Sequence, residues 1–127
     1  MTIDQVIAQV DELKPNQVTR ADKIKWLSRL DRRIFEQVIS RHEKEEGAPD
    51  AFPGYGQDTP PDTELLAPPP YDEVYRFYLE MHIDLVNQEL DKYNNSAALY
   101  ASAWGQLARA WHREHRPLDT KGAAMRF

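Results

Sequence analysis

The sequence predicts a single all-α domain, residues 1–127, with three to four helices. Apolar residues recur at intervals of three and four over three stretches, which is the spacing of one face of an α-helix. Prolines separate these stretches, and seven of the nine prolines fall within residues 48–70. A chain of 127 residues is long enough to bury about two thirds of its unfolded surface in one core.

The first two predicted helices occupy the N-terminal third of the chain. The first begins after Thr2, which opens a capping-box pattern, and ends near Lys14, because a proline follows. The second begins after Thr19 and is expected to end near Gly47, since glycine is typical of helix ends. Their apolar faces comprise Ile3, Val6, Ile7, Val10 and Leu13 in the first, and Ile24, Leu27, Leu30, Ile34, Val38 and Ile39 in the second.

Residues 47–69 are predicted to form a long irregular loop, because the density of proline and glycine excludes a helix or a central strand. The segment Thr63–Leu66 fits either a short edge strand or a single turn. The loop also contains large apolar residues, which a disordered linker lacks. We therefore expect it to be ordered and to dock the side chains of Phe52, Tyr55, Leu65 and Leu66.

One long helix, from about Tyr71 to about His115, is predicted to complete the fold. Its apolar stripe stays in phase across Asn94–Ser96, although asparagine and serine often mark helix ends. The helix either runs through this point, with or without a kink, or breaks there and folds back as a hairpin. The unbroken phase favours the continuous helix. Residues 117–127 are expected to form a flexible tail, or an arm that a partner orders.

Candidate metal and catalytic groups are present, but none has the spacing of a known site. His112 and His115 are three residues apart on a helix, where solvated side chains that complement the negative helix end are favoured. His82 lies on the apolar stripe and is expected to be a core residue. There is no cysteine to act as nucleophile or ligand. The sequence predicts no enzyme activity, no cofactor and no metal, and it predicts solvation of the loop acids Asp58, Asp62 and Glu64.

The charge balance argues against a general nucleic-acid binder, because 16 basic and 21 acidic residues give a net charge of −5. No segment approaches the ~20 apolar residues of a membrane span, so a soluble protein is expected. Basic residues gather around Trp26, but Asp22 and Asp31 dilute them, and a solvated helix face is favoured. These basic residues are Arg20, Lys23, Lys25, Arg29, Arg32 and Arg33.

The aromatic residues of the long predicted helix suggest an interaction role. Two short helices cannot cover a stripe about eleven turns long, whereas a second copy of the chain could. We expect contacts with a second copy or a partner at Phe52, Tyr55, Leu65, Leu66, Tyr100, Trp104, Trp111 and Phe127.

Three segments together resemble the small head–tail connector, or adaptor, proteins that are encoded in the head-to-tail modules of tailed phages and of prophages of Gram-positive bacteria. They are IDQVIAQVDELKPNQV (residues 3–18), KIKWLSRLDRRIFEQVISRHE (residues 23–43) and the stretch from Thr63 to Pro117. The most specific pieces are ELLAPPPYD (residues 64–72) and YNNS (residues 93–96).

This resemblance implies a structural protein of virion assembly that forms a ring beneath the portal. Its partners would be other copies of itself, the portal, and neighbouring connector or tail proteins. It would lie at the head–tail junction of the virion, and in the bacterial cytoplasm during assembly. DNA would pass through passively, without sequence-specific contacts, and no enzyme activity or membrane partner is implied. A small intracellular helical module for protein binding or regulation is the alternative.

Overall fold

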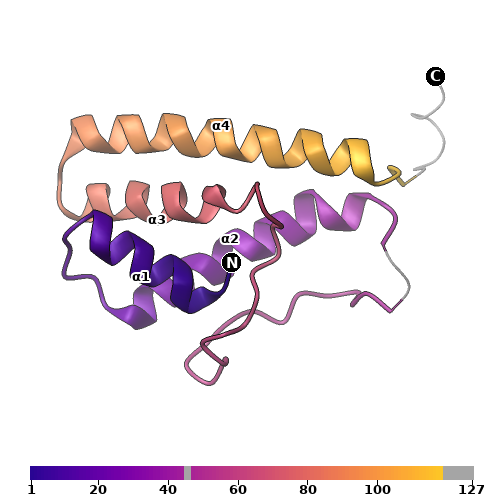
Figure 1. Cartoon of the computed structure of the whole chain (residues 1–127), viewed down its shortest axis with the longest axis horizontal. Coiled ribbons are helices and arrows are strands. Elements are labelled where there is room, and N and C mark those ends of the chain that lie inside the picture. The colour runs from indigo at the N-terminus through magenta and orange to yellow at the C-terminus, as the bar shows by residue number, and fades with distance from the viewer. Residues whose placement is uncertain (45–46, 119–127) are drawn as a thin grey trace.

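The computed structural model describes residues 1–44 and 47–118, and within them it confirms the all-α fold (Figure 1). Within these described residues, four α-helices and one short 3₁₀ helix follow one another. They are α1 (Ile3–Leu13), α2 (Arg20–Gln37), η1 (Ile39–Arg41), α3 (Glu73–Val86) and α4 (Leu90–Glu114).

Helix α3 lies at the centre of the fold. Figure 1 shows α4 running antiparallel along one side of α3, with α1 and α2 on the other side. Its inward residues are accordingly buried, and Val74, Tyr75, Leu79 and Ile83 expose none of their surface. The capping box predicted at Thr2 is present, since Thr2 and Gln5 exchange backbone-to-side-chain hydrogen bonds at the start of α1.

The predicted continuous helix from about Tyr71 to about His115 is wrong. Helix α3 ends at Val86, α4 begins at Leu90, and the chain reverses direction between them. Gln88 adopts a left-handed conformation with φ of 58°, which is uncommon for a residue other than glycine. Neither glycine nor proline lies in this turn, so the sequence contains none of the usual helix-breaking residues where the chain reverses.

The helix is continuous through Asn94–Ser96, as the phase of the apolar stripe favoured, and the alternative break there does not occur. Ser96 is buried, and its hydroxyl donates to Asp84 Oδ2 of α3 at 2.7 Å. The other oxygen of this fully buried carboxylate, Oδ1, accepts from Lys14 Nζ at 2.6 Å. Ser96 therefore fastens α4 to α3 instead of starting a helix.

Helix α2 ends ten residues before the predicted end near Gly47, at Gln37. After η1 the backbone pairs with the residues that follow α4, through an isolated bridge between His42 and Pro117. The amide of Glu43 donates to the carbonyl of Arg116 at 2.8 Å. This pairing uses backbone groups that a longer α2 would need for its own helical hydrogen bonds.

The chain between η1 and α3 returns across α2 to the N-terminus (Figure 1). The segment Thr63–Leu66 forms an isolated bridge there, since the amide of Leu65 donates to the carbonyl of Met1 at 3.0 Å. Leu65 and Ala67 are buried, so this part of the loop belongs to the core.

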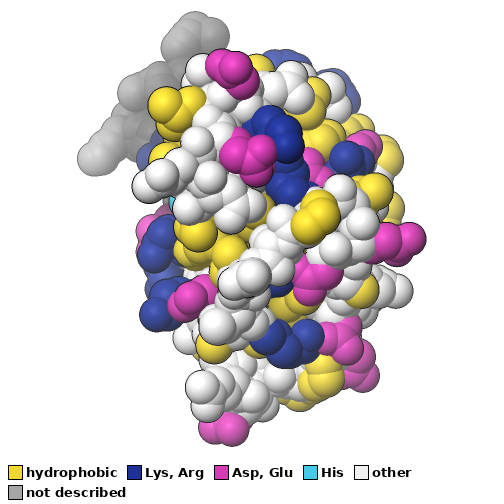
Figure 2. All heavy atoms as spheres, turned by 90° about the vertical axis from the view of Figure 1, so that its left-hand side faces the viewer, with side chains coloured by type: hydrophobic (Ala, Val, Ile, Leu, Met, Phe, Trp, Pro, Cys, Tyr) yellow, Lys and Arg dark blue, Asp and Glu magenta, His cyan; other side chains and the backbone are white. Residues whose placement is uncertain are grey.

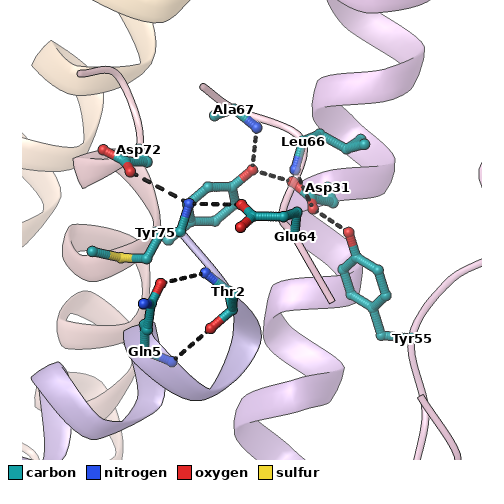
Figure 3. A network of polar contacts seen from close by, with 10 residues as sticks. Thr2, Gln5, Asp31, Tyr55, Glu64, Leu66, Ala67, Asp72 and Tyr75 are labelled. Atoms are coloured by element: carbon teal, nitrogen blue, oxygen red, sulfur yellow. Dashed lines mark hydrogen bonds and ion pairs between the residues drawn. The ribbon is translucent and has the colours of Figure 1, made fainter. Parts of the chain in front are cut away.

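A buried carboxylate holds the loop against the helices (Figure 3). Asp31 of α2 has no exposed surface, so the expectation that it belongs to a solvated helix face is wrong. Its Oδ1 accepts from the Tyr75 hydroxyl at 2.6 Å, and its Oδ2 accepts from the Tyr55 hydroxyl at 2.5 Å and the Leu66 amide at 3.1 Å. The amide of Ala67 donates to the Tyr75 oxygen at 2.6 Å. One side chain thus joins α2, α3 and two points of the loop.

Replacing Asp31 with alanine is expected to lower the free energy of unfolding by about 3 kcal/mol. The change leaves two hydroxyls and one amide without their acceptor, and a buried donor without a partner costs about 1–3 kcal/mol. Urea unfolding followed by circular dichroism measures the effect. Asp62→Ala is the matched control, because Asp62 is exposed in the same loop. Equal stability of the two variants would contradict the structural role of Asp31.

Substitutions within Asn94–Ser96 are expected to have opposite effects on stability. Ser96→Ala removes a hydrogen bond to a buried carboxylate and should lower the free energy of unfolding by about 1–2 kcal/mol. Asn95→Ala should raise it by up to about 0.5 kcal/mol, because Asn95 is exposed within α4 and alanine is the better helix former. Thermal or urea unfolding of both variants distinguishes the two effects, and a loss at Asn95 as large as at Ser96 would be inconsistent with this packing.

Candidate functional site

A pocket of about 440 Å³ lies where the long loop meets the C-terminal ends of α2 and α4. Two larger hollows, of about 710 Å³ and 580 Å³, have mixed polar linings. The smaller pocket, which we call the loop pocket, is the one that gathers large apolar side chains. It is lined by Phe35, Ile39, Glu43, Lys44, Ala48, Pro49, Ala51, Phe52, Pro53, Tyr55, Thr63, Glu64, Leu66, Trp111 and His115.

Aromatic contacts hold the wall of the loop pocket in place. The ring of Phe52 lies 6.4 Å from that of Phe35 and 5.1 Å from that of Tyr55, centroid to centroid. The amide of Tyr55 donates to Ser28 Oγ of α2 at 3.0 Å. Gly54 has a φ of 90°, and a Cβ there would lie 3.3 Å from that same Oγ. Glycine thus permits both the turn and the close approach of the loop to α2.

Burial and the charge of Asp31 keep the hydroxyls of Tyr55 and Tyr75 protonated, so that both act as hydrogen-bond donors. Burial and the neighbouring carboxylate raise the pKa of both Tyr55 and Tyr75, so their hydroxyls remain protonated at neutral pH. Burial also raises the pKa of Asp31, and the hydrogen bonds from the two tyrosines and from the Leu66 amide oppose that rise. The network is enclosed by protein and serves to position the loop.

The structure brings together four of the eight residues expected to make intermolecular contacts. Phe52, Tyr55 and Leu66 of the loop and the distant Trp111 of α4 all line the loop pocket. The side-chain nitrogen of Trp111 is buried and has no hydrogen-bond partner among the described residues. Trp111 therefore contributes to the lining of the loop pocket, while its side-chain nitrogen is enclosed by protein.

Three of the other expected contact residues do not join this site. Leu65 and Tyr100 expose only 5% and 8% of their surface, because this chain's own core covers them. Trp104 is half-buried, with the guanidinium of Arg33 4.5 Å from its ring centroid. Phe127 lies outside the described residues.

Exposed apolar side chains also occur around the turn between α3 and α4, which Figure 1 shows at the end of the fold opposite the C-terminal ends of α2 and α4. Figure 2 faces this end and shows hydrophobic side chains among charged ones. Four large apolar residues there expose about half of their surface or more, and we call them the end patch. They are Leu13 (53%), Leu85 (49%), Val86 (58%) and Leu90 (63%). Sequence reasoning missed the end patch because it did not predict the turn.

The basic residues of α2 make contacts within the chain. Lys23 is buried, and its Nζ lies 2.5 Å from Asp11 Oδ1 of α1. Arg33 Nη1 donates to the Tyr100 hydroxyl at 3.0 Å, while its guanidinium lies over Trp104. The expected solvated basic face is therefore wrong for Lys23, and part of the positive charge is used to pack α1 and α4 against α2.

The histidines do not form the pair that was considered from sequence. His115 stacks on Trp111 with ring centroids 4.0 Å apart, whereas His112 Nδ1 lies 3.3 Å from Nε2 of His42. Among residues 1–44 and 47–118 there is no cluster of three or more histidine, cysteine or acidic side chains that could hold a metal ion. The loop acids Asp58 and Asp62 are exposed, in agreement with the expected solvation.

His82 is half-buried and packs between aromatic rings, so the expected core position holds only in part. It stacks on Trp26 with centroids 5.0 Å apart and meets Tyr78 at 4.5 Å. Its Nε2 is buried without a partner in the described part of the chain. Burial lowers the pKa of His82, and the positive charge of Arg29 lowers it further.

His82 is expected to make the protein less stable as the pH falls below about 6.5. A lowered pKa in the folded state means that the unfolded chain binds the proton more tightly, so the stabilisation present above pH 6.5 is lost on acidification. The thermal midpoint measured from pH 7.5 to pH 5 should fall less steeply in His82→Phe, which keeps an aromatic ring at this position. Identical slopes in the two proteins would contradict this prediction.

Comparisons of the chain with protein-family models, with curated proteins and with solved structures found no match. Within the described residues, no helix is both long enough and apolar enough to span a membrane.

Proposed function

We propose that this protein is a head–tail connector, or adaptor, that assembles as a ring between the portal and the tail components of a phage or prophage particle. The observation that supports this function best is the presence of two apolar surfaces at opposite ends of the molecule. Leu90 of the end patch and Trp111 of the loop pocket are about 30 Å apart along α4, at 1.5 Å per residue. Contact between unlike surfaces is heterologous, and it generates a ring when the rotation between subunits closes.

The partner at the loop pocket is accordingly a second copy of this chain, whose end patch inserts into the pocket. The patch consists of aliphatic side chains, and the pocket offers the rigid aromatic walls that such anchors fill at protein interfaces.

The contact between end patch and loop pocket is expected to be weak, which suits subunits that assemble into a ring only on the portal. Burying one aliphatic side chain fully contributes about 1.5–3 kcal/mol, and the end patch side chains are already partly covered. A few such side chains barely exceed the cost of bringing two molecules together, which is about 4 kcal/mol or more. A closed ring on the portal adds further contacts for each subunit, so we expect monomers in solution and rings on the portal.

The charge distribution supports a passive DNA conduit. The chain carries a net charge of −5, and Lys23 and Arg33 are engaged by groups of the same chain. The net negative charge would therefore weaken attraction to phosphate groups, and weak attraction favours passage of DNA over retention. The sequence resemblance to connector proteins, which covers nearly the whole chain, is a further support for the proposal.

The proposed ring contact predicts the behaviour of two complementary variants. Val86→Glu places a charge in the end patch, and Phe52→Glu places one in the loop pocket. Neither variant alone should form the ring that the wild-type chain forms on the portal protein of the same genome. Mixed together on the portal, the two variants retain one intact pair of surfaces and should bind there as pairs but form no closed ring. Leu99→Glu is the control, because Leu99 is exposed in the middle of α4 and belongs to neither surface.

Negative-stain imaging and native mass spectrometry of portal mixtures measure these outcomes. Normal rings from both variants would exclude the proposed contact. If Phe52→Glu prevents binding while Val86→Glu behaves as wild type, the loop pocket instead takes a segment of another protein, as in the helical binding module.

A further inference from the structure

His42 and His112 bring two ring nitrogens together at the point where the chain leaves α4. His42 Nε2 and His112 Nδ1 are 3.3 Å apart, and the two rings are inclined by 75°. The residues lie 70 positions apart in sequence, so the fold alone creates this pair. It belongs to neither the loop pocket nor the end patch, and the proposed ring contact does not use it.

The surroundings of His42 leave its Nε2 free to bind a ligand. His42 Nδ1 lies 2.7 Å from the carbonyl oxygen of Val38, which can only accept, so Nδ1 carries the proton. In the neutral ring Nε2 then presents a lone pair toward His112. A histidine whose second nitrogen donates to a backbone carbonyl is the usual arrangement of a metal ligand, since that bond fixes both tautomer and ring orientation.

We propose that His42 and His112 form a two-histidine site for Zn²⁺ or another transition-metal ion that prefers imidazole, with water completing the coordination. Zn–N bonds of about 2.0–2.1 Å across a tetrahedral angle place two nitrogens roughly 3.3 Å apart, which is the separation found here. On binding, the proton of His112 resides on Nε2, and Nδ1 supplies the second lone pair. Imidazole suits Zn²⁺, Cu²⁺ and Ni²⁺, whereas Mg²⁺ prefers oxygen ligands.

The two histidines can be reached from solvent, and an ion bound between them would link two segments of the chain. His42 is 8% exposed while His112 is exposed, so the ion would bind from solvent. Arg41 and Glu43 flank His42 in sequence, and their charges cancel. Because His42 also pairs with Pro117 through its backbone, a bound ion would fasten the end of α4 to the segment that follows η1.

Thermal unfolding with added ZnCl₂ tests the site on the full chain. A ligand at ten times its dissociation constant shifts the folding equilibrium about elevenfold, which raises the Tm by a few degrees. We expect this rise for the wild type and for His115→Ala, no rise for His112→Ala, and no rise with MgCl₂. His112 is exposed, so its removal should leave the chain folded.

Isothermal titration calorimetry provides a second readout, with one Zn²⁺ per wild-type chain and none for His112→Ala. The proposal is overturned if millimolar Zn²⁺ leaves the wild-type Tm unchanged, since the two rings then form only a hydrogen bond. It is also overturned if His112→Ala responds as strongly as the wild type does, since the ion then binds elsewhere.

Discussion

A carboxylate without exposed surface needs hydrogen bonds from the protein itself, and at Asp31 this need determines the course of the long loop. The loop returns to α2 twice to supply donors, first with the hydroxyl of Tyr55 and then with the amide of Leu66. Tyr75 joins the same group from α3. Proline and glycine prevent the loop from forming a helix or strand. Hydrogen bonds to the buried Asp31 therefore fix its conformation in place of regular backbone hydrogen bonds. The loop pocket exists because the loop is held there.

A second buried acid organises the opposite end in the same way. Asp84 near the end of α3 accepts from Lys14, just past α1, and from Ser96 of α4. Between the two acids, apolar packing around α3 forms the core. Each polar centre thus lies near one of the two surfaces that we propose to meet in the ring. The loop pocket depends on the hydrogen bonds of Asp31. The end patch depends on the tight α3–α4 turn, which the contacts of Asp84 stabilise.

The sequence predicted the parts of the fold that local physics determines. Apolar periodicity located the helical stretches, and Thr2 capped α1 as expected. The α3–α4 turn was not predicted, because Gln88 occupies the left-handed position of a Schellman helix ending, where glycine or asparagine is usual. The amide of Glu89 donates to the carbonyl of Asp84 at 2.9 Å, and the amide of Gln88 donates to that of Leu85 at 3.1 Å. Asp31 offered a signal that was missed: it lies four residues after Leu27 and three before Ile34, on the apolar face of α2. Four of the residues expected to contact a partner line the loop pocket, and their intermolecular contacts remain a prediction, while Leu65 and Tyr100 are buried in this chain's own core.

Native-state hydrogen exchange tests most directly whether Asp31 orders the loop. The amides of Leu66 and Ala67 donate to Asp31 and to Tyr75, so they should exchange as slowly as amides in the middle of α3, despite lying in a loop without regular structure. The exposed amide of Gln57 in the same loop serves as the fast reference. If Leu66 and Ala67 exchange as fast as Gln57, the buried carboxylate does not hold the loop, and the loop pocket is not a fixed feature of the fold.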